Sequence, residues 1–214
     1  MRRRMLASVV GKPLPYDAEV EWLQSDGNAF IDTGVFLNSE SSVRARFVDI
    51  ADGKSSCYFG SRVSANARNI GAGRGNGTMY PSCYVDFNDY SYSSTRLASS
   101  GITIFDSEIE IFTSKSLREI RCAGRVVQNN TSVSQVFECT TPLYVFKMSG
   151  NPPSDVRLAS NARFLSFSVD GVLDMTPVRF TNENGEREGA MYDRVSGKLF
   201  RNAGTGAFII GPDK

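Results

Sequence analysis

The sequence predicts an all-β fold, and three observations carry this prediction. Apolar and polar residues alternate along many short segments, as they do in half-buried strands. Asp-Gly and Asn-Gly pairs separate these segments, and such pairs supply the positive φ angles of tight turns. No segment sustains an apolar stripe at the 3.6-residue period of a helix. Many short strands without intervening helices indicate a sandwich or a barrel.

The clearest alternation lies in residues 43–50, where apolar Val43, Ala45 and Phe47 alternate with Arg44 and Arg46. Residues 102–112 repeat the pattern with isoleucines and glutamates. Further strands are predicted at residues 18–23, 29–32, 57–61, 82–87, 119–122, 143–147, 163–169 and 178–181, with turns at 26–27, 52–53, 76–77, 170–171 and 184–185. The one short helical candidate is 155–161. The glycine-rich residues 71–77 are predicted to form a mobile loop, because they lack the Lys-Ser/Thr pair and following helix of a phosphate-binding loop.

A chain of 214 residues is long enough to form one large hydrophobic core that needs no disulfide or metal ion to stabilise it. We expect a flexible N-terminal arm, residues 1–15, and a single domain, residues 16–214. The 24 basic and 23 acidic residues give a net charge of +1, so no nucleic-acid partner is expected. The apolar run after the three N-terminal arginines is shorter than the roughly 7–15 residues of a signal peptide. No run approaches the roughly 18 apolar residues of a membrane span, so no membrane insertion is expected.

The four cysteines, Cys57, Cys83, Cys122 and Cys139, stand alone, and the chain has no histidine. A zinc site would need four cysteines without the usual paired spacing, which disfavours it. Buried thiols within strands are the favoured interpretation. Two disulfides remain open, in any of three connectivities.

Two long segments resemble a known family. Residues 19–34 read EVEWLQSDGNAFIDTG, and residues 189–212 read GAMYDRVSGKLFRNAGTGAFIIGP. The first resembles the opening, and the second the ending, of laminin G-like, or concanavalin A-like, domains of gut Bacteroidetes and their phages. With the intervening residues 164–169, Asp174 and residues 177–179, the resemblance spans about 16–213. It implies a two-sheet antiparallel jelly-roll sandwich whose first and last segments are adjacent in one sheet. Both motifs are interpreted as fold signatures rather than as a ligand site.

Catalysis is not predicted. Without histidine, no histidine-based triad or general base is available. Asp106, Glu108 and Glu110 resemble the carboxylate row of laminarinase-type glycoside hydrolases, but the acid types at the first and central positions are exchanged. Two-residue spacing on one strand does not exclude the carboxylate separation of about 5–5.5 Å that retaining enzymes need. A solvent-facing charged row explains the pattern more simply, so no catalytic residue is assigned.

A ligand-binding site is predicted in the tyrosine-rich segment 79–92, because sugars stack on aromatic rings and are oriented by polar groups. The predicted ligand-binding residues are Tyr80, Tyr84, Asn88, Tyr90, Tyr92 and Arg74. Asp86 and Asp89 carry oxygens of the type that calcium prefers, so calcium stays open as a cofactor. The alternative also stays open that the even-numbered residues from 80 to 92 are the outer face of a strand.

The resulting hypothesis is a non-catalytic, lectin-like binding module for a glycan or a host surface receptor. The resemblance implies a bacterial or phage protein, and the arginine-rich start, the expected lack of a signal peptide and the proline-flanked tether favour a phage virion component. Such a component would be a capsid decoration, fibre or tail adhesin, with residues 1–15 contacting other virion proteins. Its location would be a virion or an extracellular or cell surface, and an oligomer is left open. The alternatives are a structural phage particle protein without glycan binding and a glycoside hydrolase of the laminarinase type.

Overall fold

The computed structural model describes residues 13–50, 56–64, 67–75, 82–88, 94–96, 106–133, 135–150 and 160–214, with the backbone alone for 63–64, 67–68, 75, 82–86, 88 and 94–96. These residues contain strands and no helix. The strands are β1 (Ala18–Glu19), β2 (Leu23–Ser25), β3 (Ile31–Asp32), β4 (Val43–Val48), β5 (Ser56–Ser64), β6 (Ala67–Gly75), β7 (Ser82–Asn88), β8 (Ser94–Arg96), β9 (Glu108–Thr113), β10 (Arg118–Cys122), β11 (Arg125–Asn130), β12 (Tyr144–Val145), β13 (Arg163–Val169), β14 (Leu173–Thr181), β15 (Arg187–Asp193), β16 (Lys198–Phe200) and β17 (Phe208–Ile210). The all-β prediction is confirmed.

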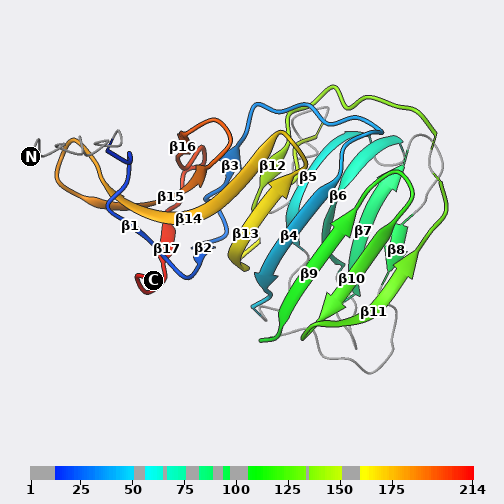
Figure 1. Ribbon diagram of the computed structural model, residues 1–214, viewed down its shortest axis with the longest axis horizontal. Coiled ribbons are helices and arrows are strands. Elements are labelled where there is room, and N and C mark those ends of the chain that lie inside the picture. The colour runs from blue at the N-terminus through cyan, green and yellow to red at the C-terminus, as the bar shows by residue number, and fades with distance from the viewer. Residues whose placement is uncertain are drawn as a thin grey trace, which may run out of the picture.

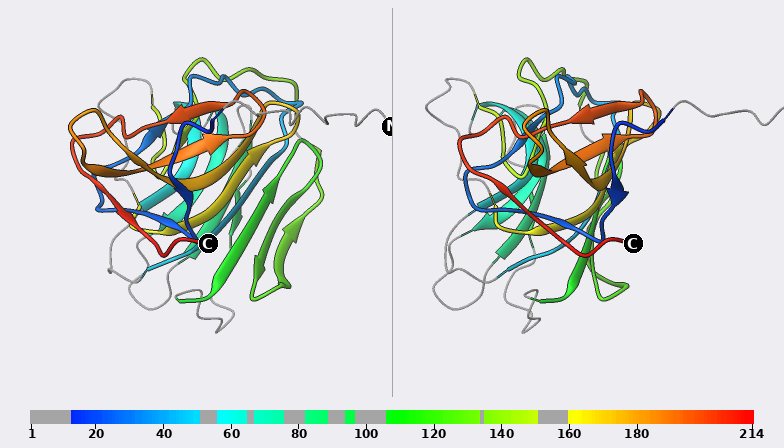
Figure 2. Two further views of the ribbon diagram at one scale, coloured as in Figure 1. Left: turned by 60° about the vertical axis from the view of Figure 1, so that its left-hand side comes forward. Right: turned by 90° about the vertical axis from the view of Figure 1, so that its left-hand side faces the viewer.

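The strands form two antiparallel sheets that pack face to face. The larger, 11-stranded sheet runs β11-β10-β9-β4-β13-β14-β15-β16, with β1, β2 and β17 joined beside this path. The smaller, six-stranded sheet runs β3-β12-β5-β6-β7-β8. In Figure 1, β4, β9 and β10 lie side by side in front of β5, β6 and β7, and both views of Figure 2 show the teal strands to the left of the green ones.

The core lies between the two sheets, and the alternation read from the sequence determines which side chains enter it. Val43, Ala45 and Phe47 are completely buried, whereas the intervening arginines of β4 are exposed. Phe47 contacts Tyr58 of the opposite sheet with ring centroids 4.3 Å apart. Paired aromatic rings stabilise such a contact beyond the apolar area that they bury. The rings therefore link the two layers.

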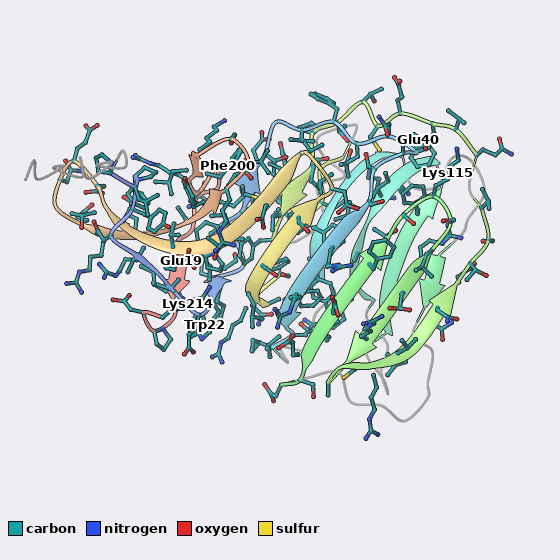
Figure 3. All side chains as sticks on the ribbon, viewed as in Figure 1. Glu19, Trp22, Glu40, Lys115, Phe200 and Lys214 are labelled. Carbon is teal, nitrogen blue, oxygen red and sulfur yellow. The ribbon has the colours of Figure 1, made fainter. Side chains whose placement is uncertain are left out.

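The two ends of the described chain close the larger sheet together. β2 pairs with β17, with Leu23 opposite Ile210, and Val20 forms an isolated bridge to Asp213. At the same edge Lys214 Nζ lies 3.5 Å from Glu19 Oε2, and Figure 3 shows both side chains beside Trp22. The prediction that the first and last segments are neighbours is confirmed.

The prediction of a mobile loop at residues 71–77 is wrong for residues 71–75, which belong to β6 between β5 and β7. A Cβ on Gly71 would lie 2.8 Å from the Phe59 carbonyl oxygen and 3.0 Å from Gly60 Cα. It would also lie 2.6 Å from Met148 Cε. The glycine therefore permits close packing and does not signal mobility, whereas residues 76 and 77 lie outside the described residues.

Several other boundaries differ from the sequence prediction. Residues 18–23 divide between β1 and β2, and the strand predicted at 102–112 begins at Glu108, with 102–105 outside the described residues. β11 was not predicted. Most of the helical candidate, residues 155–159, also lies outside the described residues.

The turns at Gly27, Gly171 and Gly185 are confirmed by φ values of 96°, 70° and 80°. Cys57 and Cys122 are buried in β5 and β10, and Cys139 is also buried.

The turn between β15 and β16 is organised by Asp193. Its Oδ1 accepts hydrogen bonds from the backbone N–H groups of Asp174 (2.8 Å) and Val195 (3.2 Å). Its Oδ2 accepts from the N–H (2.9 Å) and hydroxyl (2.5 Å) of Ser196. Burial alone would raise the pKa of Asp193, but these hydrogen bonds outweigh it and hold the pKa below the ordinary value of 3.8.

A carboxylate with a lowered pKa stabilises the fold above its unfolded pKa, and this contribution is lost as the pH falls through the folded value. We therefore expect Asp193→Asn to cost about 1.5–3 kcal/mol at pH 7, the range for hydrogen bonds to a charged group. The difference from wild type should shrink below pH 3.8. Urea unfolding at pH 7 and pH 3 measures both values. Asp170→Asn, at an exposed turn residue, is the control, and an equal loss at both pH values would contradict the assignment.

Candidate ligand-binding site

Three neighbouring strands of the larger sheet carry polar side chains on the face that points away from the core. In Figure 1 this face of β4, β9 and β10 is turned toward the viewer. The register aligns Arg44 with Phe112 and Glu119, and Arg46 with Glu110 and Arg121. Their neighbours along each strand, such as Ala45, Ile111 and Ile120, are completely buried. We call the outward group the polar face; it consists of Arg44, Arg46, Glu108, Glu110, Phe112, Glu119 and Arg121.

A hollow of about 240 Å³ lies on the polar face and is lined by Arg44, Glu110, Phe112, Leu117, Glu119 and Arg121. The guanidinium carbon of Arg44 lies 5.6 Å from the centroid of the Phe112 ring. This separation lies within the range of a cation–π contact. Arg44 Nε is also 3.8 Å from Glu110 Oε1. The hollow thus presents an aromatic ring beside charged groups held by their neighbours.

Ion pairs position the remaining groups of the polar face. Arg121 Nε lies 2.6 Å from Glu119 Oε1, and its Nη1 lies 3.9 Å from Glu110 Oε2. On β4, Arg46 donates from Nε and Nη2 to one oxygen of Glu108, at 2.9 and 2.7 Å. The face contains as many arginines as glutamates. It therefore offers oriented donors and acceptors without a strong net charge.

The same ion pairs bear on the carboxylate row considered for catalysis. Glu108 and Glu110 share the outer face of β9, where Glu108 pairs with Arg46, and Glu110 lies within 4 Å of Arg44 and Arg121. Asp106 lies in the turn before β9 with a φ of 56° and does not extend the row.

The sequence-predicted site lies on the other sheet, and the structure describes part of it. Residues 84, 86 and 88 belong to β7, where they pair with Gly73, Gly71 and Asn69 of β6. Phe87 lies between two of them, is completely buried and packs against Phe137 at 5.4 Å. Tyr84, Asp86 and Asn88 therefore occupy strand positions that alternate with a core residue. Tyr80, Asp89, Tyr90 and Tyr92 lie outside the described residues.

No family model matches the sequence, and no curated protein matches it either. Among solved structures, the chain is similar to domains LG4-5 of the mouse laminin alpha1 chain, with a TM-score of 0.51 at 10% sequence identity. The match covers 93% of this chain and 48% of the laminin fragment, so the chain spans about half of that fragment. The fold is a laminin G-like jelly roll. At this identity the likeness establishes the fold alone.

A second solved structure, the enzymatically active domain of tailspike protein 2 from bacteriophage CBA120, aligns with a TM-score of 0.42 and 10% identity. The alignment covers 91% of this chain and 34% of the tailspike domain, and the likeness is too distant to support an argument. In the described part of the laminin G-like jelly roll, no helix has the length and apolar character needed to cross a membrane.

Arg74 does not lie where the sequence-based hypothesis placed it. In this jelly roll its side chain is only 2% exposed, and Nη1 lies 2.9 Å from both carboxylate oxygens of Asp49. Tyr58 Oη donates to the same carboxylate at 2.8 Å. Arg74 follows Ile70 and Ala72 at alternate positions of β6, so it enters the space between the sheets. Its observed contacts belong to the core rather than to a surface ligand site.

The C-terminal motif of the jelly roll borders a second hollow of about 360 Å³, between β15 and residues 201–208. Here Asn202 Oδ1 accepts from the N–H groups of Phe30 (3.2 Å) and Gly204 (2.8 Å), and its Nδ2 donates to the Gly206 carbonyl (2.6 Å). Arg201 lies over the Phe180 ring at 4.6 Å. These contacts support the interpretation of the motif as a fold signature.

No group of three or more Cys, Asp or Glu side chains that could hold a metal ion occurs among the residues whose side chains are described. Calcium at Asp86 and Asp89 therefore stays a prediction. The hollow on the polar face was not predicted as a site, although the alternation had placed Arg44 and Glu110 on outward positions. One feature of the sequence could have indicated this site. Only four residues separate 108–113 from 118–122, which predicts a hairpin, and in that hairpin Phe112 lies opposite Glu119.

Proposed function

We propose that this protein is a non-catalytic binding module that recognises carbohydrate on a cell or particle surface through the polar face. The observation that carries the proposal is the hollow of about 240 Å³, in which the Phe112 ring lies beside ion-paired arginines and glutamates. Binding sites commonly combine such an apolar surface with a few oriented polar groups. The resemblance of both terminal motifs to phage and gut-bacterial domains supports a role on a virion or another extracellular surface.

The chemistry of a sugar matches these groups. A pyranose ring offers a C–H face that can stack on Phe112, and its neighbouring hydroxyls can bridge Glu119 and Arg121. A planar guanidinium group donates two hydrogen bonds with defined geometry, and a carboxylate accepts two. Because arginines and glutamates balance on this face, it favours a neutral glycan over a polyanion such as nucleic acid.

We expect Phe112→Ala to weaken glycan binding by at least about tenfold, equivalent to about 1.4 kcal/mol, because it removes the stacking surface. A glycan array, followed by calorimetry on the best ligand, measures the effect. Lys115→Gln is the matched control, since Lys115 lies in the same hairpin and does not line the hollow. Parallel titrations in calcium and in a chelator test whether calcium contributes.

Four outcomes would contradict the proposal. Unchanged binding by Phe112→Ala would exclude the hollow, and loss of binding in Tyr84→Ala alone would assign the site to β7. Hydrolysis of β-glucans that Glu108→Gln abolishes would establish the glycosidase alternative. An array without any binder would favour a purely structural role.

A further inference from the structure

We infer that β11 is a docking edge for a second copy of this chain, so that two larger sheets join through antiparallel β11 strands. β11 ends the larger sheet, pairs with β10 on one side, and no other described strand pairs with it. Figure 1 shows it at the end of the row formed by β4, β9 and β10. An unpaired strand edge presents N–H and C=O groups that another strand can bond.

The other sheet edges are shorter than this one. β11 has six residues, whereas β16, β3 and β8, at the remaining ends of the two sheets, have three, two and three as described. Very short edges and edge lysines are common means of preventing strand pairing, and β16 carries Lys198. β11 uses neither of these two devices, and its register against β10 shifts once, at Val127. A strand of six residues offers about 20 Å of edge for a partner.

The chemistry of this edge also favours pairing. From Val126 to Phe137 the sequence VVQNNTSVSQVF contains no charged residue and no proline. Val126, Val133 and Val136 are 49%, 71% and 78% exposed. Uncharged segments rich in β-branched and amide side chains readily add to strand edges. A partner that pairs along β11 would cover Val126, which belongs to the strand.

A second copy fits this edge because the strand complements itself. Val127 is an extra residue in the pairing with β10, so Val126 lies opposite Arg121 and Asn129 opposite Glu119, both on the side of the polar face. In an antiparallel pair centred between Val127 and Gln128, Val126 of one chain then lies opposite Asn129 of the other on the same face. Arg125, the strand's one charged residue, lies opposite Asn130, so like charges do not meet. Isologous contacts of this kind close into a two-fold dimer. A charged partner would find no counter-charge between residues 126 and 137.

Hydrogen bonds from Arg118 of β10 fix the chain at the end of β11. Arg118 of β10 is completely buried, and its Nη2 donates to Ser132 O at 2.8 Å and to Ser132 Oγ at 2.5 Å. The same nitrogen lies 3.3 Å from Asn130 Oδ1. These bonds fix the chain where it leaves β11. A pre-ordered edge loses less conformational entropy when it binds a partner.

The dimer would place two polar faces on the same side of one continuous sheet, because the two-fold axis is normal to that sheet. This consequence rests on the proposed function, whereas the pairing itself does not. Two linked sites on one surface can raise the apparent affinity for a glycan-covered surface by about 10²–10⁴-fold. Weak single-site binding would then suffice for attachment.

Sedimentation equilibrium of the full chain tests the pairing without any ligand. We expect wild type to form a dimer, and the double variant Val126→Lys with Asn129→Lys to raise the dimer Kd by roughly a hundredfold, since lysines meet across the axis. The control, Val172→Lys with Val195→Lys, adds the same charge at exposed valines in two turns and should leave the dimer intact.

A charge-swap experiment separates repulsion from misfolding. Mixing the double lysine variant with the variant Val126→Glu and Asn129→Glu should restore a dimer of one chain of each kind. A monomeric wild type at the highest soluble concentration would overturn the inference, as would an oligomer unaffected by the lysines. Failure of the mixed variants to associate would overturn it as well. None of these results depends on glycan binding, so the two proposals fail separately.

Discussion

Asp49→Ala is expected to destabilise the folded chain by about 3–5 kcal/mol, because it leaves the Arg74 guanidinium buried without this carboxylate. Both side chains are within 2% of complete burial, and the Arg74 Nη1 to Asp49 oxygen distance is 2.9 Å. Tyr58, which donates to Asp49 at 2.8 Å, would also lose this hydrogen bond. A loss of this size is a large part of the 5–15 kcal/mol that stabilises a typical domain. Urea unfolding followed by fluorescence and circular dichroism measures it.

Two controls sharpen this test. Glu40→Ala removes a carboxylate that is 72% exposed and pairs with Lys115 at 2.8 Å, at the corner labelled in Figure 3. It should leave the unfolding midpoint unchanged, since exposed pairs contribute little. The double variant Asp49→Leu with Arg74→Met should recover part of the loss, because neither member of this buried pair is then charged. A single Asp49→Ala variant as stable as Glu40→Ala would refute the buried pair.

Phe164→Ala is expected to cost about 3–5 kcal/mol, the range for removing a buried aromatic side chain. Phe164 is completely buried, and its ring lies 5.2 Å from Phe47 and 4.6 Å from Phe146. Phe146 in turn contacts Phe208 at 4.9 Å. Phe164 thus contacts β4 and the segment after β12 directly, and it is linked to β17 through Phe146. Loss of the Phe164 ring should lower the urea midpoint of unfolding to the same extent in all three regions.

Phe36→Ala is the matched control for this truncation. Phe36 is 60% exposed, so the same chemical change should alter the free energy of unfolding by less than about 0.5 kcal/mol. Equilibrium unfolding by urea compares the two variants directly. If Phe164→Ala and Phe36→Ala cost the same, the two sheets do not share the aromatic core described here.

The alternation of apolar and polar residues was sufficient to predict most strands. It placed Val43, Ala45 and Phe47 in the core, and tight-turn glycines such as Gly171 were recognised correctly. β11 was missed because its asparagines and glutamine resemble a loop, although pairing with β10 stabilises it. β6 was missed because glycine usually indicates flexibility, whereas Gly71 is required by close packing against Gly60.

The candidate site was harder to predict, because it depends on which strands become neighbours. Arg44 and Glu110 were recognised as outward residues, but their position beside Arg121 follows from the register of three strands. Arg74 was taken as a surface residue, because an arginine in a glycine-rich segment resembles a loop residue. Its burial follows from its alternation with glycines in β6 and from the presence of Asp49 on the opposite layer.

Chemical-shift mapping with an isotope-labelled chain tests the central claim most directly. Titration with the tightest ligand from the array should shift the amide signals of residues 44–46, 108–112 and 117–121, around the hollow on the polar face. Signals of β14 and β15 should stay in place, and the glycan should be recovered uncleaved. Shifts confined to β6 and β7, or cleavage of the glycan, would contradict the account.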